Sequence, residues 1–256
     1  MTASVAALYR YPVKGLSPER LGRVAVTPGE GLPGDRALAL ALADTEFDAA
    51  APRHLPKTRF LVLLRHERLA GLKTRLETDG GTRRLVIRNR DGQLLLDRPI
   101  DDAAGRQAIA DFFAGCFPDY CAAGVPRLVE APGHMFSDVP AKVVSLINPA
   151  SVAALGAEVG AALDLLRFRG NVHLDGVAPW AEFGWIGAEL TIGDVRLRVT
   201  QRIRRCAATD VDPDTGARDQ KLPAALMARF GHGDLGVYAE VLSAGSLTEG
   251  DQVTLG

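Results

Sequence analysis

The chain has only three cysteines among its 256 residues and no long run of apolar residues. An odd cysteine count, in a chain that does not begin with a basic and then apolar leader, argues against a disulfide framework. The longest apolar runs, such as "FLVLL" and "ALALALA", fall far short of the ~20 residues that cross a bilayer. We therefore expect a cytoplasmic protein with no membrane partner.

Net charge and the familiar cofactor motifs are also scarce. The formal net charge of −1 gives no reason to expect a nucleic-acid partner. No GxGxxG or GxxxxGK[ST] sequence is present, so the common nucleotide-binding folds lack their fingerprint. The histidines show no HExxH pattern, and the spacing of Cys116 and Cys121 fits no zinc site. These absences argue against an ordinary nucleotide or zinc enzyme.

The first hundred residues contain many short apolar or alternating runs bounded by Gly, Pro and Asp, which predict strands. Leucine and alanine alternate from Ala37 to Ala43, as in a strand packed on both faces. Asp91-Gly92 between two runs predicts a hairpin. So many short strands suit a barrel or a strongly bent sheet. The predicted strands are "SVAALYRY", "LGRVAVTP", "RALALALAD", "RFLVLLR", "RLVIRNR" and "QLLLDRP".

Helical patterns follow at 102–115, at 148–163 and around 223–230. Asp101 or Asp102 is the expected N-cap of the first helix; Asn148 caps the second, with Pro149 in its first turn. Between the first two, "EAPGHMFSDVPAK" has no periodicity and predicts a loop. We expect a β-rich α+β fold with a soft boundary near residue 120.

Cys206 is placed unusually for a surface or core thiol. In "TQRIRRCAATDVDPDTGARDQ" it follows three arginines at the end of an alternating strand and precedes a "DPDTG" turn. Cationic neighbours favour the thiolate, which is both a nucleophile and a ligand for soft metals. By residue type alone the simpler interpretation is a buried thiol beside solvated arginines.

Cationic residues also gather in turns beside Gly or Pro. Lys14 lies in "YPVKG", Arg36 in "PGDRA", and Arg169 with Asn171 in "FRGNV". Such groups can converge on a phosphate or another anion, although each one alone is more typical of a solvated surface charge. Further on, the aromatics of "PWAEFGW" predict a plug at a barrel end, and Glu182 within it is free to pair with an arginine.

Together and in this order, these segments resemble the MOSC family, named for the C-terminal domain of molybdenum-cofactor sulfurases. The likeness is greater to its two-part members, which include amidoxime-reducing components. "YPVKG" and "GLPGDRALAL" are similar to the family's N-terminal β-barrel motifs; "FRGNVHLDG", "RCAATDVDPDTG" and the closing "GVYAEVLSAGSLTEGDQVTLG" are similar to the MOSC domain. The resemblance implies an N-terminal barrel domain at 1–120 and a MOSC barrel domain with flanking helices at 121–256.

The resemblance also implies a cofactor and the residues that bind it. Cys206 falls where the family places the thiolate ligand of molybdenum. The positions matching the pyranopterin and phosphate site are Lys14, Gly15, Arg36, Arg169, Asn171, Arg204 and Arg205. The cofactor expected is the molybdenum cofactor, with neither pyridoxal phosphate nor an iron–sulfur cluster in this chain.

Three positions depart from the family pattern. Gly15 stands where many relatives have Ser, Arg204 stands where a Ser is common, and Asp210 replaces a frequent Thr. Asp210 could tune protonation near the metal, or pair with Arg204 or Arg205. Asp210 or Asp212 could also relay protons, although Asp212 is well placed to set the turn.

The function implied is reduction of N-hydroxylated small molecules, such as amidoximes or hydroxylamines, by reduced molybdenum. Electrons are expected from a separate reductase: a flavoprotein, or a ferredoxin-like or cytochrome b5-like protein. The alternative is a carrier that passes on the cofactor, or a persulfide sulfur held on Cys206. A plain binding barrel with an inert thiol is a third interpretation.

Overall fold

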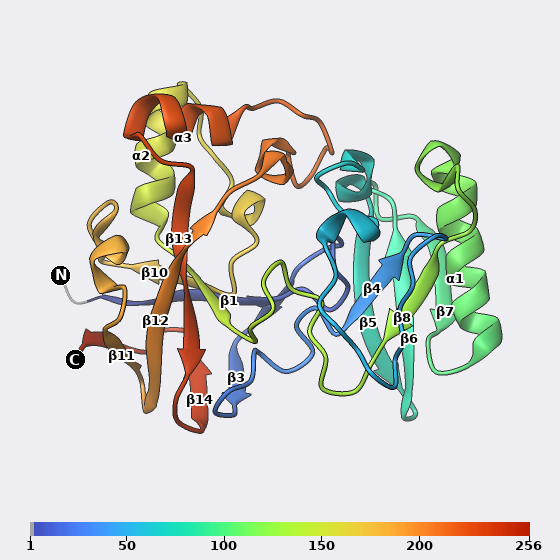
Figure 1. The fold of residues 1–256 in the computed structure, drawn as a ribbon, viewed down its shortest axis with the longest axis horizontal. Coiled ribbons are helices and arrows are strands. Elements are labelled where there is room, and N and C mark those ends of the chain that lie inside the picture. The colour runs from blue at the N-terminus through green and yellow to red at the C-terminus, as the bar shows by residue number, and fades with distance from the viewer. Residues whose placement is uncertain (1–2) are drawn as a thin grey trace.

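The computed structural model describes residues 3–256, which form a strand-rich fold of two lobes with three α-helices (Figure 1). This confirms the predicted β-rich α+β class. The strands are β1 (Ser4–Arg10), β2 (Glu19–Leu21), β3 (Arg23–Val26), β4 (Leu38–Ala41), β5 (Lys73–Asp79), β6 (Thr82–Arg88), β7 (Leu94–Pro99), β8 (Arg127–Glu130), β9 (Val144–Ile147), β10 (Val172–Asp175), β11 (Glu189–Ile192), β12 (Val195–Arg204), β13 (Asp234–Val241), β14 (Gly245–Thr248) and β15 (Val253–Leu255). The helices are α1 (Ala103–Cys116), α2 (Pro149–Val159) and α3 (Leu222–Phe230).

The large lobe is built on an eight-stranded sheet of order β15-β11-β12-β13-β9-β10-β1-β2, with the pair β14-β3 beside it. Helices α2 and α3 lie together at one end of this lobe, where Figure 1 shows them at upper left. Side chains along β12 and β13 alternate between the two faces of the sheet, and one set points into the core. Leu197 and Val237 belong to this set and are fully buried. The sheet and its core hold β9, β10 and β12 in fixed register.

The small lobe contains the meander β5-β6-β7, the pair β4-β8 and helix α1. Its core takes Ile109 and Phe113 from α1, Leu40 from β4 and, from far along the chain, Val211. The two lobes therefore do not correspond to the first and second parts of the sequence. Strands β1–β3 pair within the large lobe, while β8, past residue 120, pairs with β4 in the small lobe. Residues 1–120, predicted as one domain, therefore contribute strands to the large lobe, and residues 121–256, predicted as the other, contribute a strand to the small lobe.

Helix starts and the hairpin follow the local signals. The Asp102 carboxylate accepts a hydrogen bond from the Gly105 N–H at 2.7 Å, and Asn148 Oδ1 accepts one from the Ala150 N–H at 3.0 Å. Gly92 has the positive φ of 84° that the turn between β6 and β7 requires. Within residues 3–256, no helix has both the length and the apolar character needed to span a membrane.

One predicted strand is wrong. The run at 59–65 makes a single bridge, Ala41 to Phe60, and then turns. The cause is His66, whose Nδ1 accepts a hydrogen bond from the Val62 N–H at 3.1 Å and so takes a donor that a strand would need. The side chains of Phe60 and Leu61 are nevertheless buried, which explains the strand-like hydrophobicity.

The aromatic stretch seals the large lobe as predicted, but its carboxylate does not pair with an arginine. Phe183, Trp180 and Trp185 pack against the sheet core. Glu182 is fully buried and accepts hydrogen bonds from Ser151 Oγ at 2.8 Å and Asn148 Nδ2 at 2.8 Å. The expectation that Glu182 pairs with an arginine is wrong, because neutral donors from α2 and its N-cap residue occupy the carboxylate.

A buried histidine makes stability depend on pH. His173 of β10 is 3% exposed, and its Nε2 has no partner within residues 3–256. Burial lowers the pKa of His173 from 6.5 to about 4. His173 is therefore protonated near pH 6.5 in the unfolded chain but only near pH 4 in the folded chain. The free energy of unfolding consequently decreases as the pH falls from 6.5 to about 4.

We expect this one group to cost about 3 kcal/mol of unfolding free energy across that window. Urea unfolding of wild type and His173→Phe, followed across the window, measures it. The variant should lose less stability than wild type as the solution is acidified. Parallel curves for the two proteins would contradict this assignment.

Candidate functional site

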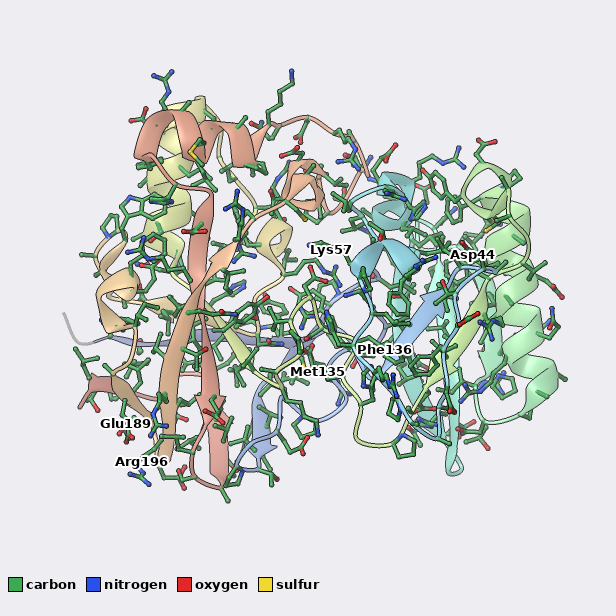
Figure 2. The ribbon with its side chains drawn as sticks, in the orientation of Figure 1. Asp44, Lys57, Met135, Phe136, Glu189 and Arg196 are labelled. Carbon is green, nitrogen blue, oxygen red and sulfur yellow. The ribbon has the colours of Figure 1, made fainter. Side chains whose placement is uncertain are left out.

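A cavity of about 480 Å³ lies at the junction of the two lobes. Figure 2 labels Lys57, Met135 and Phe136 in this region, between the large sheet and the small lobe. Of the residues predicted from the sequence, those lining the cavity are Lys14, Gly15, Arg36, Arg169, Asn171, Arg204, Arg205 and Cys206. Asp210 and Asp212 are not among the lining residues. Segments far apart in the chain thus meet around one space.

Cys206 is held at the junction by both lobes. It lies two residues after Arg204, the last residue of β12, and the N–H of the intervening Arg205 donates to the Gly233 carbonyl at 2.8 Å. Beyond it, η6 (Ala207–Asp210) leads directly to Val211, which is buried in the small-lobe core. Arg218 ties the same segment down by donating to the Ala207 carbonyl at 2.6 Å. The thiol is partly exposed and lines the cavity.

A chain of charges leads from this thiol into the small lobe. Lys57 Nζ lies 3.4 Å from Cys206 Sγ and 2.8 Å from Asp138 Oδ2. The other oxygen of Asp138 accepts a hydrogen bond from Lys14 Nζ at 2.6 Å. Although burial acts against it, the two ammonium groups hold the pKa of Asp138 far below its usual range. One carboxylate therefore serves two lysines, leaving one positive charge in excess.

The ring of the buried Tyr11 contacts two arginines that line the cavity. The guanidinium carbons of Arg169 and Arg36 lie 4.2 Å and 4.9 Å from the centre of its ring. Both arginines have positive φ, 51° and 50°, a conformation that costs a non-glycine residue energy and is concentrated at functional sites. Asp35 neutralises Arg36, and the Tyr11 N–H donates to the same carboxylate at 2.7 Å.

Arg169, unlike Arg36, forms no ion pair within residues 3–256. Its Nη2 is buried without any hydrogen-bond partner in the described part of the chain. Burial lowers the pKa of Arg169 from 12.5 to about 10, with Arg36 adding to the effect. A buried cation with an unused donor is costly unless something supplies an acceptor. The position suits an anionic ligand.

The two arginines beside Cys206 differ. Arg205 donates through Nε to the Leu235 carbonyl at 2.8 Å and through Nη1 to the Phe168 carbonyl at 2.9 Å. Burial lowers its pKa from 12.5 to about 10. Arg204 is exposed and makes no ion pair within residues 3–256. Arg205 is thus fixed by the fold, and Arg204 is free at the cavity edge.

Two predicted cofactor contacts have a structural explanation. Asn171 is 1% exposed; its Oδ1 accepts from Ser145 Oγ at 2.7 Å and its Nδ2 donates to the Tyr9 carbonyl at 3.1 Å. It therefore joins β1 to β9. Gly15 has a φ of 83°, and a Cβ there would lie 2.6 Å from the Leu61 carbonyl oxygen. Glycine is required at this position by the backbone, whatever the loss of a serine hydroxyl.

The two predicted proton-relay carboxylates have other partners. Asp212 Oδ1 accepts hydrogen bonds from the N–H groups of Asp214 and Thr215 and so sets the turn, as the sequence indicated. Its Oδ2 lies 2.9 Å from Nη2 of the buried Arg167. Asp210 accepts from the Leu222 N–H at 2.8 Å at the start of α3, and pairs with neither Arg204 nor Arg205. The lining carboxylate is instead Asp138.

The donor set decides what could bind here. Within residues 3–256, no group of three or more His, Cys, Asp or Glu side chains is arranged to hold a metal ion. A metal bound at Cys206 must therefore bring most of its own ligands. A metal already chelated by an anionic organic group fits this requirement, because one thiol stands beside several cationic side chains. Residues 14, 36, 169 and 206 meet this test together.

Three residues of the site carry no clear sequence signal. Lys57 lies in "HLPKTRF" without any periodic pattern, and Asp138 lies in the loop that breaks periodicity. Tyr11 lies in "YPVKG", where an aromatic residue is typical of a core position, and it is indeed buried, with 0% of its surface exposed.

Comparison with known proteins places this geometry in a family context. Residues 133–254 match the MOSC domain model. The chain is 28% identical over 158 residues to human mitochondrial amidoxime-reducing component 1, covering 50% of this chain and 46% of that protein. It is 31% identical over 122 residues to the bovine (Bos taurus) mitochondrial amidoxime reducing component 2, covering 43% and 36%. The chain thus spans less than half the length of these curated relatives.

Among solved structures, the YuaD protein from Bacillus subtilis aligns over 100% of this chain and 96% of its own, with a TM-score of 0.49 and 14% identity. The YiiM protein from Geobacillus stearothermophilus aligns over 44% and 53%, with a TM-score of 0.36 and 18% identity.

Proposed function

We propose that the cavity holds a molybdenum–pterin cofactor and that the protein reduces N-hydroxylated compounds; the match of residues 133–254 to the MOSC domain model supports this. The observation that carries the proposal is that one cavity is lined both by a partly exposed thiol, Cys206, and by a buried arginine, Arg169, whose Nη2 has no hydrogen-bond partner in residues 3–256. The names of the curated relatives support amidoximes as a substrate class.

Each part of the cofactor has a matching group in the chain. Cys206 Sγ is the thiolate ligand, presented at the end of β12. Lys14, Arg36 and Arg169 face the anionic pterin and phosphate portion, and Arg205 contributes its charge from fixed hydrogen bonds to Leu235 and Phe168. When bound, the cofactor supplies a two-electron redox centre able to accept oxygen from an N–OH group.

The overall reaction sets what else is needed. Conversion of an N–OH group to N–H with release of water consumes two electrons and two protons. We propose that the electrons come from a separate reductase. Asp138, held ionised between two ammonium groups, keeps Lys57 and Lys14 in place rather than passing protons itself.

Activity with an artificial donor tests the substrate class. Protein from a host that makes the cofactor, supplied with a chemically reduced dye, should convert benzamidoxime to benzamidine at a rate proportional to its molybdenum content. The product is measured by chromatography. Fully loaded protein without turnover would rule out this substrate class. A metal-free protein carrying one added sulfur atom on Cys206 would favour the carrier function instead.

A further inference from the structure

Three cations that line the cavity, two of them exposed and one partly exposed, are not assigned to the cofactor in the proposal above. Lys57, Arg202 and Arg204, here called the mouth cluster, all line the cavity. Arg202 and Arg204 are exposed residues of β12, and the Lys57 side chain is 29% exposed. Arg202 lies over the ring of Phe183 at 4.3 Å. The cluster thus borders both solvent and Cys206.

The charge of the mouth cluster is poorly balanced. Neither Arg202 nor Arg204 forms an ion pair with any carboxylate in residues 3–256. Lys57 shares its one carboxylate, Asp138, with Lys14. Deeper in the cavity, by contrast, Arg36 has Asp35 to itself. A wall that keeps uncompensated cations next to solvent attracts anions to that place.

Lys57 is the member nearest to the chemistry. Its ammonium nitrogen is 3.4 Å from Cys206 Sγ, so a small molecule that reaches the sulfur also comes within contact of this charge. Opposite unit charges at contact distance attract each other in water, and more strongly where water is excluded. An anionic group on the substrate gains this attraction, and a neutral one does not.

We propose that Lys57, with Arg202 and Arg204, makes this site select N-hydroxylated substrates that carry a negative charge, such as a carboxylate. The substrate assignment rests on the proposed function. The electrostatic preference at Cys206 does not, because it can be measured on the thiol itself.

Alkylation of the metal-free protein provides that measurement. The Cys206 thiolate displaces iodide from both iodoacetate and iodoacetamide and becomes S-alkylated, but only iodoacetate is negatively charged. The ratio of their two rates cancels the reactivity of the sulfur and reports the local field. Peptide mass spectrometry separates Cys206 from Cys116 and Cys121. In Lys57→Met the iodoacetate-to-iodoacetamide ratio at Cys206 should fall about tenfold.

Matched variants make the result specific. Lys57→Arg keeps the charge and should keep the ratio, and Lys142→Met removes a lysine outside the cavity, one paired with Glu30, and should also keep it. The ratio at the exposed Cys116 serves as an internal reference. An unchanged ratio in Lys57→Met, or equal slowing by both reagents, overturns the proposal.

Loaded enzyme then tests the substrate assignment. Wild type should use 4-carboxybenzamidoxime with a kcat/KM about tenfold above that for benzamidoxime, and Lys57→Met should bring the two towards equality. Equal kcat/KM values in wild type would overturn the assignment. Loss of molybdenum in Lys57→Met would do so as well, since Lys57 would then serve the cofactor. Absence of turnover with both substrates, despite a normal alkylation ratio, marks failure of the proposed function alone.

Discussion

Replacing Cys206 by alanine is expected to remove molybdenum from the protein while leaving the fold intact. Among residues 3–256, the sulfur is the one thiol lining the cavity, and no neighbouring group of His, Cys, Asp or Glu side chains can replace it. The thiol is partly exposed and its side-chain contact is with Lys57. We therefore expect a change in unfolding free energy below about 1 kcal/mol and metal content at background.

Elemental analysis and thermal unfolding of the same preparation measure both effects. Cys116→Ala is the matched control, because Cys116 is exposed at the end of α1 and should not affect the metal. Metal content equal to wild type in well-folded Cys206→Ala would end the assignment of this residue as ligand.

Replacing Arg169 by methionine is expected to act in opposite directions on stability and on cofactor binding. The side chain is a buried cation with an unpartnered Nη2, and burial lowers its pKa to about 10. Its removal from the cofactor-free protein should raise the unfolding free energy by about 1–2 kcal/mol, because an uncompensated polar group is lost. Its removal should also lower cofactor loading about tenfold or more, because a charge-assisted contact is lost.

Urea unfolding of the cofactor-free protein and metal content of the purified protein follow the two effects. Arg98→Met, at an exposed position of β7, is the control and should change neither. A destabilised cofactor-free protein would contradict the view that Arg169 is kept for a ligand. So would full loading of the Arg169 variant.

Local patterns in the sequence were enough to predict the fold class, the helices and the hairpin. Capping by Asp102 and Asn148 and the turn at Gly92 depend on neighbours within a few residues. The same holds for Asp212, whose turn is fixed by Asp214 and Thr215. Caps and turns of this kind depend on the local backbone, so a few consecutive residues are enough to predict them.

Contacts across the junction could not be predicted in this way. Lys57 contacts Cys206 because Val211 is buried in the small-lobe core, which holds the segment after Cys206 against that lobe. The contact also depends on Asp138, which binds Lys57 and Lys14 together. The run at 59–65 was predicted as a strand because it is a short apolar run, but the side chain of His66 accepts a hydrogen bond from its backbone. Asn171 has the residue type of a binding group, yet its amide is engaged by Ser145 and Tyr9.

The account is tested most directly by counting molybdenum and pterin in wild-type protein purified from a host that synthesises the cofactor. If one sulfur and the cations of both lobes share a single ligand, the two should be found together and close to one of each per chain. Folded protein that contains neither, although the host loads its other molybdenum enzymes, would contradict the account.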